Sequence, residues 1–559
     1  MSVPQSCTVL VVGGGPAGSF VAAALAREDI DVVLLEAETF PRYHIGESLL
    51  PSMRYFLKII GFYDDFNNHG FTRKNGAAFQ FNRSQPEAYT DFIAADSHGY
   101  AWNVVRSEAD ELLFKHAGAS GARTFDGTKV NAVQFKPLNS EMAMNDHVDA
   151  SAAKLGQPVS ATWTRKDGSS GTIFYDYLVD ASGRQGLLST KYLKNRTVNP
   201  NLKNIADWGY WRGGATFAPG TRMENAPYFE ALQDATGWCW YIPLHNGTIS
   251  IGIVQNMETA VAKKRRMGSP STKEFYLESL KLSPRIQELL SDAELDGNAK
   301  SASDWSYHAS TYAFPRARIC GDAGCFIDPL FSSGVHLAIL GGLSAAVTIA
   351  ASIKGQVSER EAISWHTKKV HESYMRFFLV VSTGVKQITS QDEPVIRDAG
   401  ETGFDRAFDI FKPVIQGTVD ADTNCTLSRE DIHKTVEYCF NALMHISANT
   451  VLIEKFKAVH TAGTDGSGKY KAIEDLEKSL TEDESLELKY ILGFVDDMFT
   501  IDTFTINAIN GLVPNTVRGE LGLKKAEKVE VPRKERDRRQ PTEPSVTPEI
   551  TPSMNSINL

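Results

Sequence analysis

A glycine-rich loop near the start of the chain carries residue types that suit dinucleotide binding. It has the pattern G-x-G-x-x-G and consists of Gly13, Gly14, Gly15, Pro16, Ala17 and Gly18. The first glycine permits a tight turn, the second lets the backbone approach a pyrophosphate, and the third lets a helix pack against a strand. Glu36 stands eighteen residues after the last glycine, where its carboxylate can bind a ribose diol. The loop and the acid together predict a site that either NAD or FAD could fill.

Two tryptophans alternate with other residues in a W-x-W-x-I-P segment. If this segment is a strand, Trp238, Trp240 and Ile242 share one of its faces, and Pro243 ends it. An Asn-Gly pair follows, which is a hairpin turn signal, so we expect the return strand over residues 248–254. Neighbouring indoles on one face give a large rigid apolar wall. The alternative is a pair of ordinary core tryptophans.

A serine-rich loop precedes the most apolar window of the chain. Ser332, Ser333 and Gly334 lie where this loop enters a helix that we expect to begin near Val335. Backbone N–H groups at a helix start are unsatisfied and carry partial positive charge, which suits a monovalent anion. The alternative is a serine-glycine cap that binds only water.

A parallel sheet is the framework that we expect to position these residues. Residues 8–12 and 31–35 are short apolar runs typical of buried strands, and residues 19–27 between them are alanine-rich and helical in pattern. This order makes one β-α-β unit and implies parallel strands. Residues 177–180 and 318–320 are further apolar runs of the same kind.

The remaining segments carry weaker signals. Asp322 follows the last of these strands, where it could bind a polyol hydroxyl or only cap the turn. We expect a helix over 107–119 that Ser107 opens with a capping box, strands over 208–255, and mainly helices over 358–511. The charged, proline-rich end of the chain is predicted to be disordered.

The composition excludes several classes of function. The chain has 559 residues, of which 42% are hydrophobic and 23% charged, which is ordinary for a globular protein of several structural units. Its formal net charge of −10 argues against nucleic-acid binding. Six scattered cysteines without a C-x-x-C pair predict neither a disulfide framework nor a zinc site, and the 13 histidines are widely spread, so we expect no metal.

The same features predict a cytoplasmic protein without a membrane span. Scattered cysteines fit a reducing compartment, and the first residues lack the pattern of a secretory signal. The apolar window over 335–353 is long enough to cross a bilayer, but it contains a histidine, two glycines and serines. We therefore expect a buried helix there.

The three strand-ending segments, in this order, resemble the FAD-binding fold of para-hydroxybenzoate hydroxylase and its relatives over roughly residues 8–350. The resemblance implies an α/β (α+β) protein with a Rossmann-like FAD domain, an inserted β-sheet substrate region and a C-terminal helical region. It places Asp322 toward the ribityl or ribose hydroxyls and Arg106 at the flavin or a phosphate. The expected segments are 1–76, 177–207 and 301–355 for FAD, 77–176 mixed, 208–300 the substrate sheet, 356–515 a helical cover and 516–559 a disordered tail.

Three motifs, at 41–48, 238–243 and 329–336, are similar to signatures of flavin-dependent halogenases, and the span to about 515 resembles the fungal branch that acts on phenolic compounds. W-x-W-x-I-P is the specific one, because the hydroxylases lack it. The resemblance implies a set of cofactor-binding residues, namely Gly13, Gly14, Gly15, Ala17, Gly18, Glu36, Arg42, Glu47, Ser48, Arg106, Asp322, Pro329 and Val335.

The resemblance also implies a reaction. FADH2 from a separate flavin reductase reacts with O2 to give the C4a-hydroperoxide, which oxidises chloride (bromide is an alternative) held by the Ser333 and Gly334 amides. The resulting hypochlorous acid passes a tunnel wall and meets the catalytic residues Lys74 and Ser332. Lys74 would orient it as an ammonium or, with a lowered pKa, capture it as a chloramine. The implied tunnel wall consists of Trp238, Trp240, Ile242 and Pro243.

The implied substrate is a phenol that activates itself. Tryptophan halogenases carry glutamate where Phe331 stands, so the chain resembles enzymes for an electron-rich ring, such as a free polyketide-derived secondary metabolite. Two alternatives stay open at this point: an NAD(P)H-dependent phenol hydroxylase on the same fold, and a non-catalytic flavoprotein that serves as a binding module.

Overall fold

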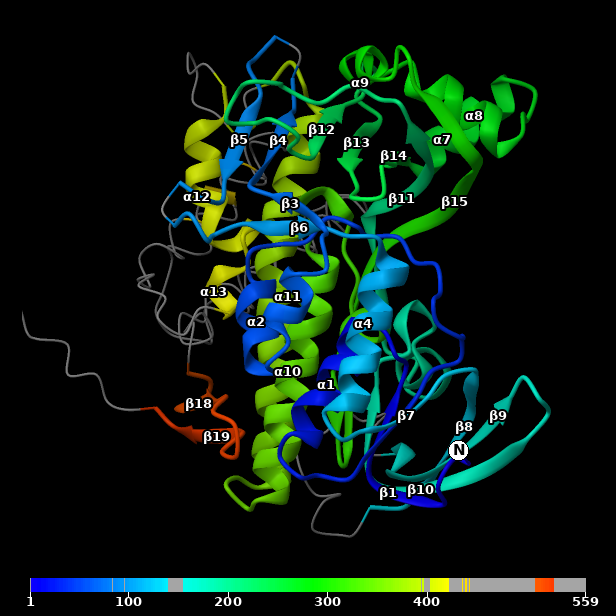
Figure 1. The fold of residues 1–559 in the computed structure, drawn as a ribbon, viewed down its shortest axis with the longest axis vertical. Coiled ribbons are helices and arrows are strands. Elements are labelled where there is room, and N and C mark those ends of the chain that lie inside the picture. Colours follow the sequence, from blue (N-terminus) through cyan, green and yellow to red (C-terminus); the bar gives the residue numbers. More distant parts are fainter. Residues whose placement is uncertain are drawn as a thin grey trace, which may run out of the picture.

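The computed structural model describes residues 2–82, 84–94, 96–138, 154–393, 395–396, 403–421, 435, 438–439, 442 and 508–526. Two sheets occupy opposite ends of this body, and two long helices, α10 (Gly334–Ile353) and α11 (Glu359–Thr389), run along its length (Figure 1).

The first sheet contains the predicted parallel core. Strand β1 pairs in parallel with both β2 and β10, and β10 pairs in parallel with β17. Helix α1 (Pro16–Ala26) connects β1 to β2, which confirms the predicted β-α-β unit. The strands of this sheet are β1 (Ser6–Val12), β2 (Val32–Leu35), β7 (Arg123–Phe125), β8 (Thr128–Lys136), β9 (Gln157–Arg165), β10 (Ser170–Asp180), β16 (Ala313–Phe314) and β17 (Ala317–Ile319).

The second sheet is largely antiparallel and contains the W-x-W-x-I-P strand. Strand β13 pairs with β14 as a hairpin, with Pro243 opposite Ile249, which confirms the predicted turn. Trp238 and Trp240 lie in one hydrophobic cluster and Cys239 and Tyr241 in another, as alternation across a strand requires. Its strands are β4 (Gly76–Gln80), β5 (Ala88–Asp91), β11 (Arg196–Arg212), β12 (Tyr228–Ala231), β13 (Gly237–Pro243), β14 (Ile249–Asn256) and β15 (Glu294–Ala309).

Four predicted segment boundaries fall inside strands. The boundaries after residues 76, 176, 207 and 300 fall inside β4, β10, β11 and β15. Strands β11 and β15 are 17 and 16 residues long and extend from the second sheet toward the first (Figure 1). The chain therefore passes between the sheets within strands, where no change of composition marks the crossing.

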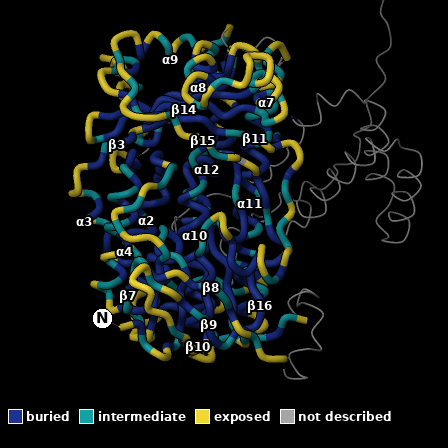
Figure 2. The backbone as a smooth tube through the Cα atoms, turned by 90° about the vertical axis from the view of Figure 1, so that its right-hand side faces the viewer, coloured by how far each residue is buried: buried dark blue, intermediate teal, exposed yellow. Residues whose placement is uncertain are grey.

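Helix α10 is the core helix of the molecule. Its apolar window is long enough to cross a membrane, yet 94% of that window is buried inside the protein, against α1, α2 and α11. Figure 2 shows buried backbone along α10 and α11 and exposed backbone over α7 (Met257–Arg266), α8 (Thr272–Leu280) and α9 (Pro284–Leu289). This agrees with the predicted buried helix.

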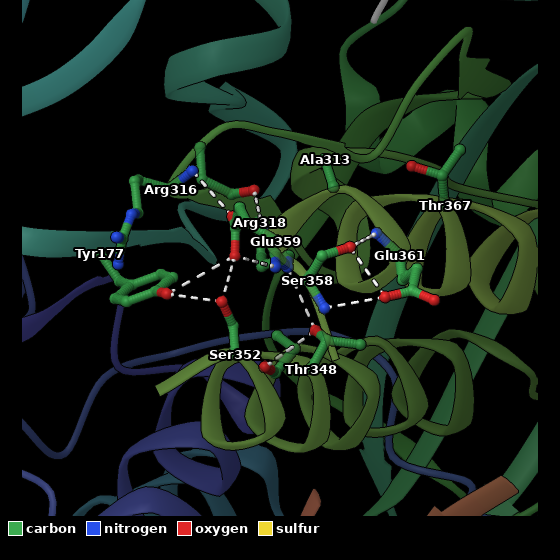
Figure 3. A network of polar contacts seen from close by, with 12 residues as sticks. Tyr177, Ala313, Arg316, Arg318, Thr348, Ser352, Ser358, Glu359, Glu361 and Thr367 are labelled. Carbon is green, nitrogen blue, oxygen red and sulfur yellow. Dashed lines mark hydrogen bonds and ion pairs between the residues drawn. The ribbon is translucent and has the colours of Figure 1, made fainter. Parts of the chain in front are cut away.

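A buried polar network fastens the first sheet to the two long helices (Figure 3). Arg318 of β17 is fully buried and pairs with Glu359, the first residue of α11, at 3.0 Å. Glu359 also accepts hydrogen bonds from Ser352 of α10 and from the Arg316 backbone amide. Burial alone would raise the pKa of Glu359, but the Arg318 guanidinium holds it below its usual range.

Smaller elements surround these layers. A two-stranded sheet pairs β3 (Thr72–Lys74) with β6 (Ala101–Asn103). Helix α4 begins at Arg106 without a side-chain cap, so the predicted capping box of Ser107 is wrong. The other described helices are α2 (Met53–Ile59), α3 (Tyr63–Asn67), α4 (Arg106–Ala119), α12 (Asp405–Ile415) and α13 (Thr418–Ala421).

The predicted disordered tail is wrong for residues 516–526. Strands β18 (Leu512–Asn515) and β19 (Gly522–Lys525) form a hairpin whose Leu521 and Leu523 are buried, and β19 contacts α10. These two leucines supply the apolar anchor that the charged surroundings concealed. Residues 527–559 lie outside the described part of the chain. The same is true of most of residues 422–507, which belong to the helical region predicted over 356–515.

Candidate functional site

A cavity of about 490 Å³ lies at the carboxyl ends of β1, β10 and β17, where ligands of open α/β sheets bind. It is bounded on the other side by residues of the second sheet, including Trp208 and Trp240. The predicted site residues that line it are Gly13, Gly15, Ala17, Glu36, Arg42, Ser48, Arg106, Trp240, Asp322, Pro329, Ser332, Gly334 and Val335.

The glycine loop is shaped as a cradle that larger residues could not form. Gly13 has a φ of +103°, and a Cβ there would lie 2.2 Å from the Ala181 carbonyl oxygen. A Cβ on Gly18 would lie 1.9 Å from the Gly13 carbonyl oxygen. The Gly14 amide donates to Glu36 at 2.6 Å, so the acid fixes the loop while it also faces the cavity. This is the geometry that a dinucleotide phosphate requires.

Asp322 supplies an acceptor that no described side chain uses. Its backbone oxygen accepts hydrogen bonds from Arg196 and Tyr307, but its carboxylate has no partner and faces the cavity. Burial raises its pKa. A half-buried carboxylate of this kind gains from a donor, and the hydroxyls of a nucleotide or ribityl chain would provide one. Together with the glycine cradle, it makes the residues fit FAD.

Two arginines share one buried carboxylate at the edge of the cavity. Arg106 donates to both oxygens of Asp110, at 2.8 and 3.0 Å, and Arg42 donates to Asp110 at 2.9 Å. Burial alone would raise the pKa of Asp110, but Arg106 holds it low. The two guanidinium groups and the one carboxylate have a net charge of +1, so this edge of the cavity suits a phosphate.

The loop before α10 contains one buried polar group without a partner in the described part of the chain, and a helix start that borders open space. Ser332 has a φ of +58°, and the buried Ser333 hydroxyl has no hydrogen-bond partner among the described residues. A Cβ on Gly334 would meet nothing within 4 Å, so this first helical residue borders open space. The space beside Gly334 would let an anion approach the helix start closely.

A buried aspartate that the sequence did not single out shapes this loop. Asp328 accepts from the Leu330 amide at 3.1 Å and from Asn204 of β11 at 2.8 Å. Burial raises its pKa to about 6. These bonds hold the turn at Pro329–Phe331 that delivers Ser332 to the cavity. The signal available in the sequence was only the Asp-Pro pair.

The two indoles pack against each other, and one of them reaches the cavity. Trp240 lines the cavity, and Trp238, outside the lining, has its ring centroid 5.9 Å from that of Trp240. The Trp240 indole donates to Ser250 of β14 at 3.1 Å, which fixes its ring. The cavity is thus bounded on this side by an indole that a second indole supports.

Lys74 lies one hydrogen bond from the cavity. It is 1% exposed, and its Nζ donates to Ser48 Oγ at 2.8 Å and to the Leu49 carbonyl oxygen at 2.9 Å. Ser48 lines the cavity. Burial lowers the pKa of Lys74 to about 7. Arg73, the alternative in the sequence, is exposed and stacks on Tyr100.

The structure does not place every predicted site residue at the cavity. Glu47 is held by the Tyr210 hydroxyl at 2.6 Å and ties the 41–48 loop to the second sheet, so it does not face the predicted cofactor. Cavity residues that the sequence did not identify as site residues include Arg184, Gln185 and Trp208. The predicted residues outside the lining are Gly14, Gly18, Glu47, Lys74, Trp238, Ile242, Pro243 and Ser333.

Comparison with known proteins decides the family. The family model described as tryptophan halogenase matches residues 8–101 and 93–382. The chain belongs to the tryptophan halogenase family. It is 51% identical over 533 residues to the flavin-dependent halogenase ascD of Acremonium egyptiacum, covering 94% of both chains. It is 49% identical over 534 residues to the sulochrin halogenase gedL of Aspergillus terreus, covering 94% of this chain and 95% of that one.

Solved halogenase structures share the fold. The myxobacterial chondrochloren halogenase CndH superposes with a TM-score of 0.61 at 25% identity, over 78% of this chain and 98% of that one. The flavin-dependent halogenase CmlS gives a TM-score of 0.61 at 26% identity, over 81% and 79%. The protein is therefore a flavin-dependent halogenase, as its sequence predicts.

Proposed function

We propose that this halogenase chlorinates an electron-rich phenolic ring, in a free polyketide-derived metabolite, through a chlorine carried by Lys74. Bound reduced FAD, supplied by a separate flavin reductase, would provide with O2 the oxidising power that turns chloride into hypochlorous acid. The observation that carries the proposal is the buried Lys74 amine, hydrogen-bonded to a residue of the cavity wall.

The burial of Lys74 favours the chloramine route over orientation by an ammonium, because it lowers the pKa of this group to about 7. A neutral amine has two N–H groups and one lone pair, and the two N–H groups are taken by Ser48 and Leu49. Its lone pair would attack the chlorine of hypochlorous acid, so that an N–Cl bond forms and the O–Cl bond breaks. One of the two N–H protons then leaves with the hydroxide as water. The ring carbon of the phenol next takes the chlorine, the ring loses a proton, and the amine is restored.

The other predicted residues would guide halide and oxidant to this amine. Chloride would lie at the amides of Ser333 and Gly334, where the helix start is positive and open. Ser332, in its left-handed conformation, would present the loop to the reacting end of the cofactor. The wall of Trp238, Trp240, Ile242 and Pro243 would keep the aromatic substrate from direct oxygenation. Bromide, being a larger monovalent anion, is the expected alternative halide.

The surroundings of Phe331 favour a phenol over an indole. Phe331 lies among aromatic rings, with centroids 5.3 Å from Phe79 and 6.2 Å from Phe408. Position 331 is a phenylalanine, so the residue there has no carboxylate to assist a poorly activated ring. The relative that is named a sulochrin halogenase is 49% identical, which supports a related substrate class.

A cytoplasmic location is part of the proposal. The free cysteines of the described residues, Cys7, Cys239, Cys320, Cys325 and Cys439, are all buried and unpaired, which fits a reducing compartment.

Product analysis tests the proposed activity. A panel of resorcinol-type phenols is incubated with enzyme, FAD, a flavin reductase, NADH and chloride, and products are identified by mass spectrometry. We expect the two-isotope chlorine pattern with wild type and its loss with Lys74→Ala, which still binds FAD. Arg73→Ala is the matched control and should keep the activity. Full chlorination by Lys74→Ala would overturn the role of the lysine.

A further inference from the structure

Two histidines and a glutamate from distant parts of the chain come together beside the turn between β13 and β14. His69 follows α3, Glu108 lies in the first turn of α4, and His245 lies in the turn between β13 and β14. The Nε2 atoms of the two histidines lie 2.9 and 3.1 Å from the same Glu108 oxygen, Oε2. All three ligand atoms lie within 4.8 Å of one another.

This arrangement matches the first coordination sphere of a divalent transition metal. Imidazole nitrogens and a carboxylate oxygen bind Zn²⁺ at about 2.0–2.2 Å, so neighbouring ligand atoms around one tetrahedral ion are about 3.3–3.6 Å apart. The two N···O separations, 2.9 and 3.1 Å, lie within a few tenths of an ångström of this length, so small side-chain shifts would admit the ion. Two histidines and one glutamate are a donor set that zinc sites use with one position left for water.

The cluster is built and accessible. Phe71 packs on both imidazoles, with centroid distances of 4.4 Å to His69 and 5.3 Å to His245, which restricts both rings. The side chains are 30%, 37% and 21% exposed for His69, Glu108 and His245, so an ion and its water can enter. None of the three lines the FAD cavity.

We propose that His69, Glu108 and His245 form a site for a divalent transition-metal ion of the zinc type. The site does not depend on the halogenation chemistry proposed above. The position of the site suggests that the ion would hold neighbouring elements together. Glu108 is two residues from Arg106, and His245 is two residues from Pro243. Phe71, which packs on both histidines, directly precedes the strand that ends at Lys74. A bound ion would tie together the three elements that carry these residues.

The expectation of a chain without metal rested on sequence spacing, which cannot detect this cluster. His69, Glu108 and His245 are separated by 39 and 137 residues, and none belongs to a zinc spacing motif. Only the fold brings them together.

Zinc titration of the tag-free full chain tests the site. Isothermal calorimetry with ZnCl2 is run on wild type, His69→Asn, Glu108→Gln and His245→Asn. His98→Asn is the control, because His98 is 75% exposed and lies beside Asp96 outside the cluster. We expect one Zn²⁺ per chain with wild type and the control, and at least about tenfold weaker binding in each cluster variant, in line with the loss of a ligand.

Two further readouts keep the outcome decisive. Co²⁺ in place of Zn²⁺ should give weak visible bands of nitrogen and oxygen ligation without thiolate charge transfer, and Zn²⁺ should raise the melting temperature of wild type but not of Glu108→Gln. Zinc that binds all three variants as tightly as wild type, a thiolate spectrum, or no binding by folded wild type would each overturn the proposal.

Discussion

At the scale of single residues, the central feature is a lysine that burial makes a weak base. Its pKa falls from an ordinary value of about 10.4 to about 7 because the side chain is desolvated. Below pH 7 the group is an ammonium without a lone pair, and above pH 7 it is an amine that can capture chlorine. The environment thus supplies at neutral pH a nucleophile that a solvated lysine provides only in alkali.

The halogenation rate should therefore rise with pH through about 7, with the slope of one ionisation. Initial rates of product formation between pH 5.5 and 8.5, with FAD reduction kept saturating, measure it. Lys74→Arg is the discriminating variant, because arginine stays charged throughout. We expect it to lose about 10²–10⁴-fold in rate. A rate that falls as pH rises, or an active Lys74→Arg variant, would favour orientation by a cation instead.

Sequence patterns identified residue types better than residue environments. The glycine loop, Glu36 and Asp322 could be predicted because a dinucleotide imposes their spacing. Lys74 and Arg73 are adjacent cations, and only the fold shows that one is buried against Ser48 while the other is exposed. Glu47 lies in a recognised motif, yet its contact with Tyr210 depends on a strand 163 residues away.

At the scale of elements, the start of α10 is the feature on which the proposed chloride site depends. Gly334 is its first residue and borders open space. A methyl group there would occupy the position proposed for chloride without disturbing the helix. The backbone amide would remain, so the change tests space rather than hydrogen bonding.

Gly334→Ala should raise the KM for chloride about tenfold or more, a cost of about 1.4 kcal/mol or more. Its melting temperature should stay the same or increase slightly, because alanine favours helix over glycine by up to about 1 kcal/mol. Chloride titrations at fixed phenol concentration and thermal melts measure the two effects. An unchanged KM for chloride would place the halide elsewhere. Ser333→Ala, which keeps both amides, is the control and should change the KM less.

The tryptophan wall of β13 gives a second prediction at this scale. Trp240→Leu shortens the side chain between the cavity and Trp238, so more oxidant should escape to solvent. With taurine added to the medium as a trap for hypochlorous acid, the yield of taurine chloramine should be several-fold higher than with wild type. The yield of chlorinated phenol should decrease by a similar factor. Trp305→Ala, on an exposed tryptophan, is the control. An unchanged ratio of trapped to transferred chlorine would show that these rings are ordinary core residues.

Sequence patterns predicted local elements better than the boundaries between the larger segments of the chain. The β-α-β unit, the β13–β14 hairpin and α10 could be predicted because each depends on a pattern within a short stretch of sequence. The long strands β11 and β15 carry no break where they pass from one sheet toward the other, so the predicted boundaries after 207 and 300 cut through them. The β18–β19 hairpin was missed because its buried leucines stand among charged residues.

At the scale of the whole molecule, a buried ion pair fastens the cofactor sheet to the helical core. Arg318 and Glu359 join β17 to α11, and their network includes Ser352 of α10 (Figure 3). Removal of one member leaves an unpaired buried charge, which costs about 3–5 kcal/mol. The pair thus holds the frame in which Asp322 and the start of α10 are positioned.

Arg318→Met should lower the free energy of unfolding by about 3–5 kcal/mol, whereas Lys281→Ala, on an exposed pair with Glu278, should change it by less than about 1 kcal/mol. Urea unfolding followed by fluorescence measures both. Because the folded pKa of Glu359 is depressed, its contribution is complete above its unfolded pKa, near 4.5, and is lost as pH falls through the lower folded value. A variant as stable as wild type would show that the pair contributes nothing.

Peptide mass spectrometry of the enzyme after turnover without phenol tests the central claim most directly. Enzyme supplied with FAD, reductase, NADH, O2 and chloride is quenched and digested, and chlorine is located by its isotope pair. We expect chlorine in place of one hydrogen on the peptide that contains Lys74, and its transfer to a phenol added before the quench. Oxidant production with no chlorine on Lys74, while added phenol is still chlorinated, would contradict a lysine-borne chlorine.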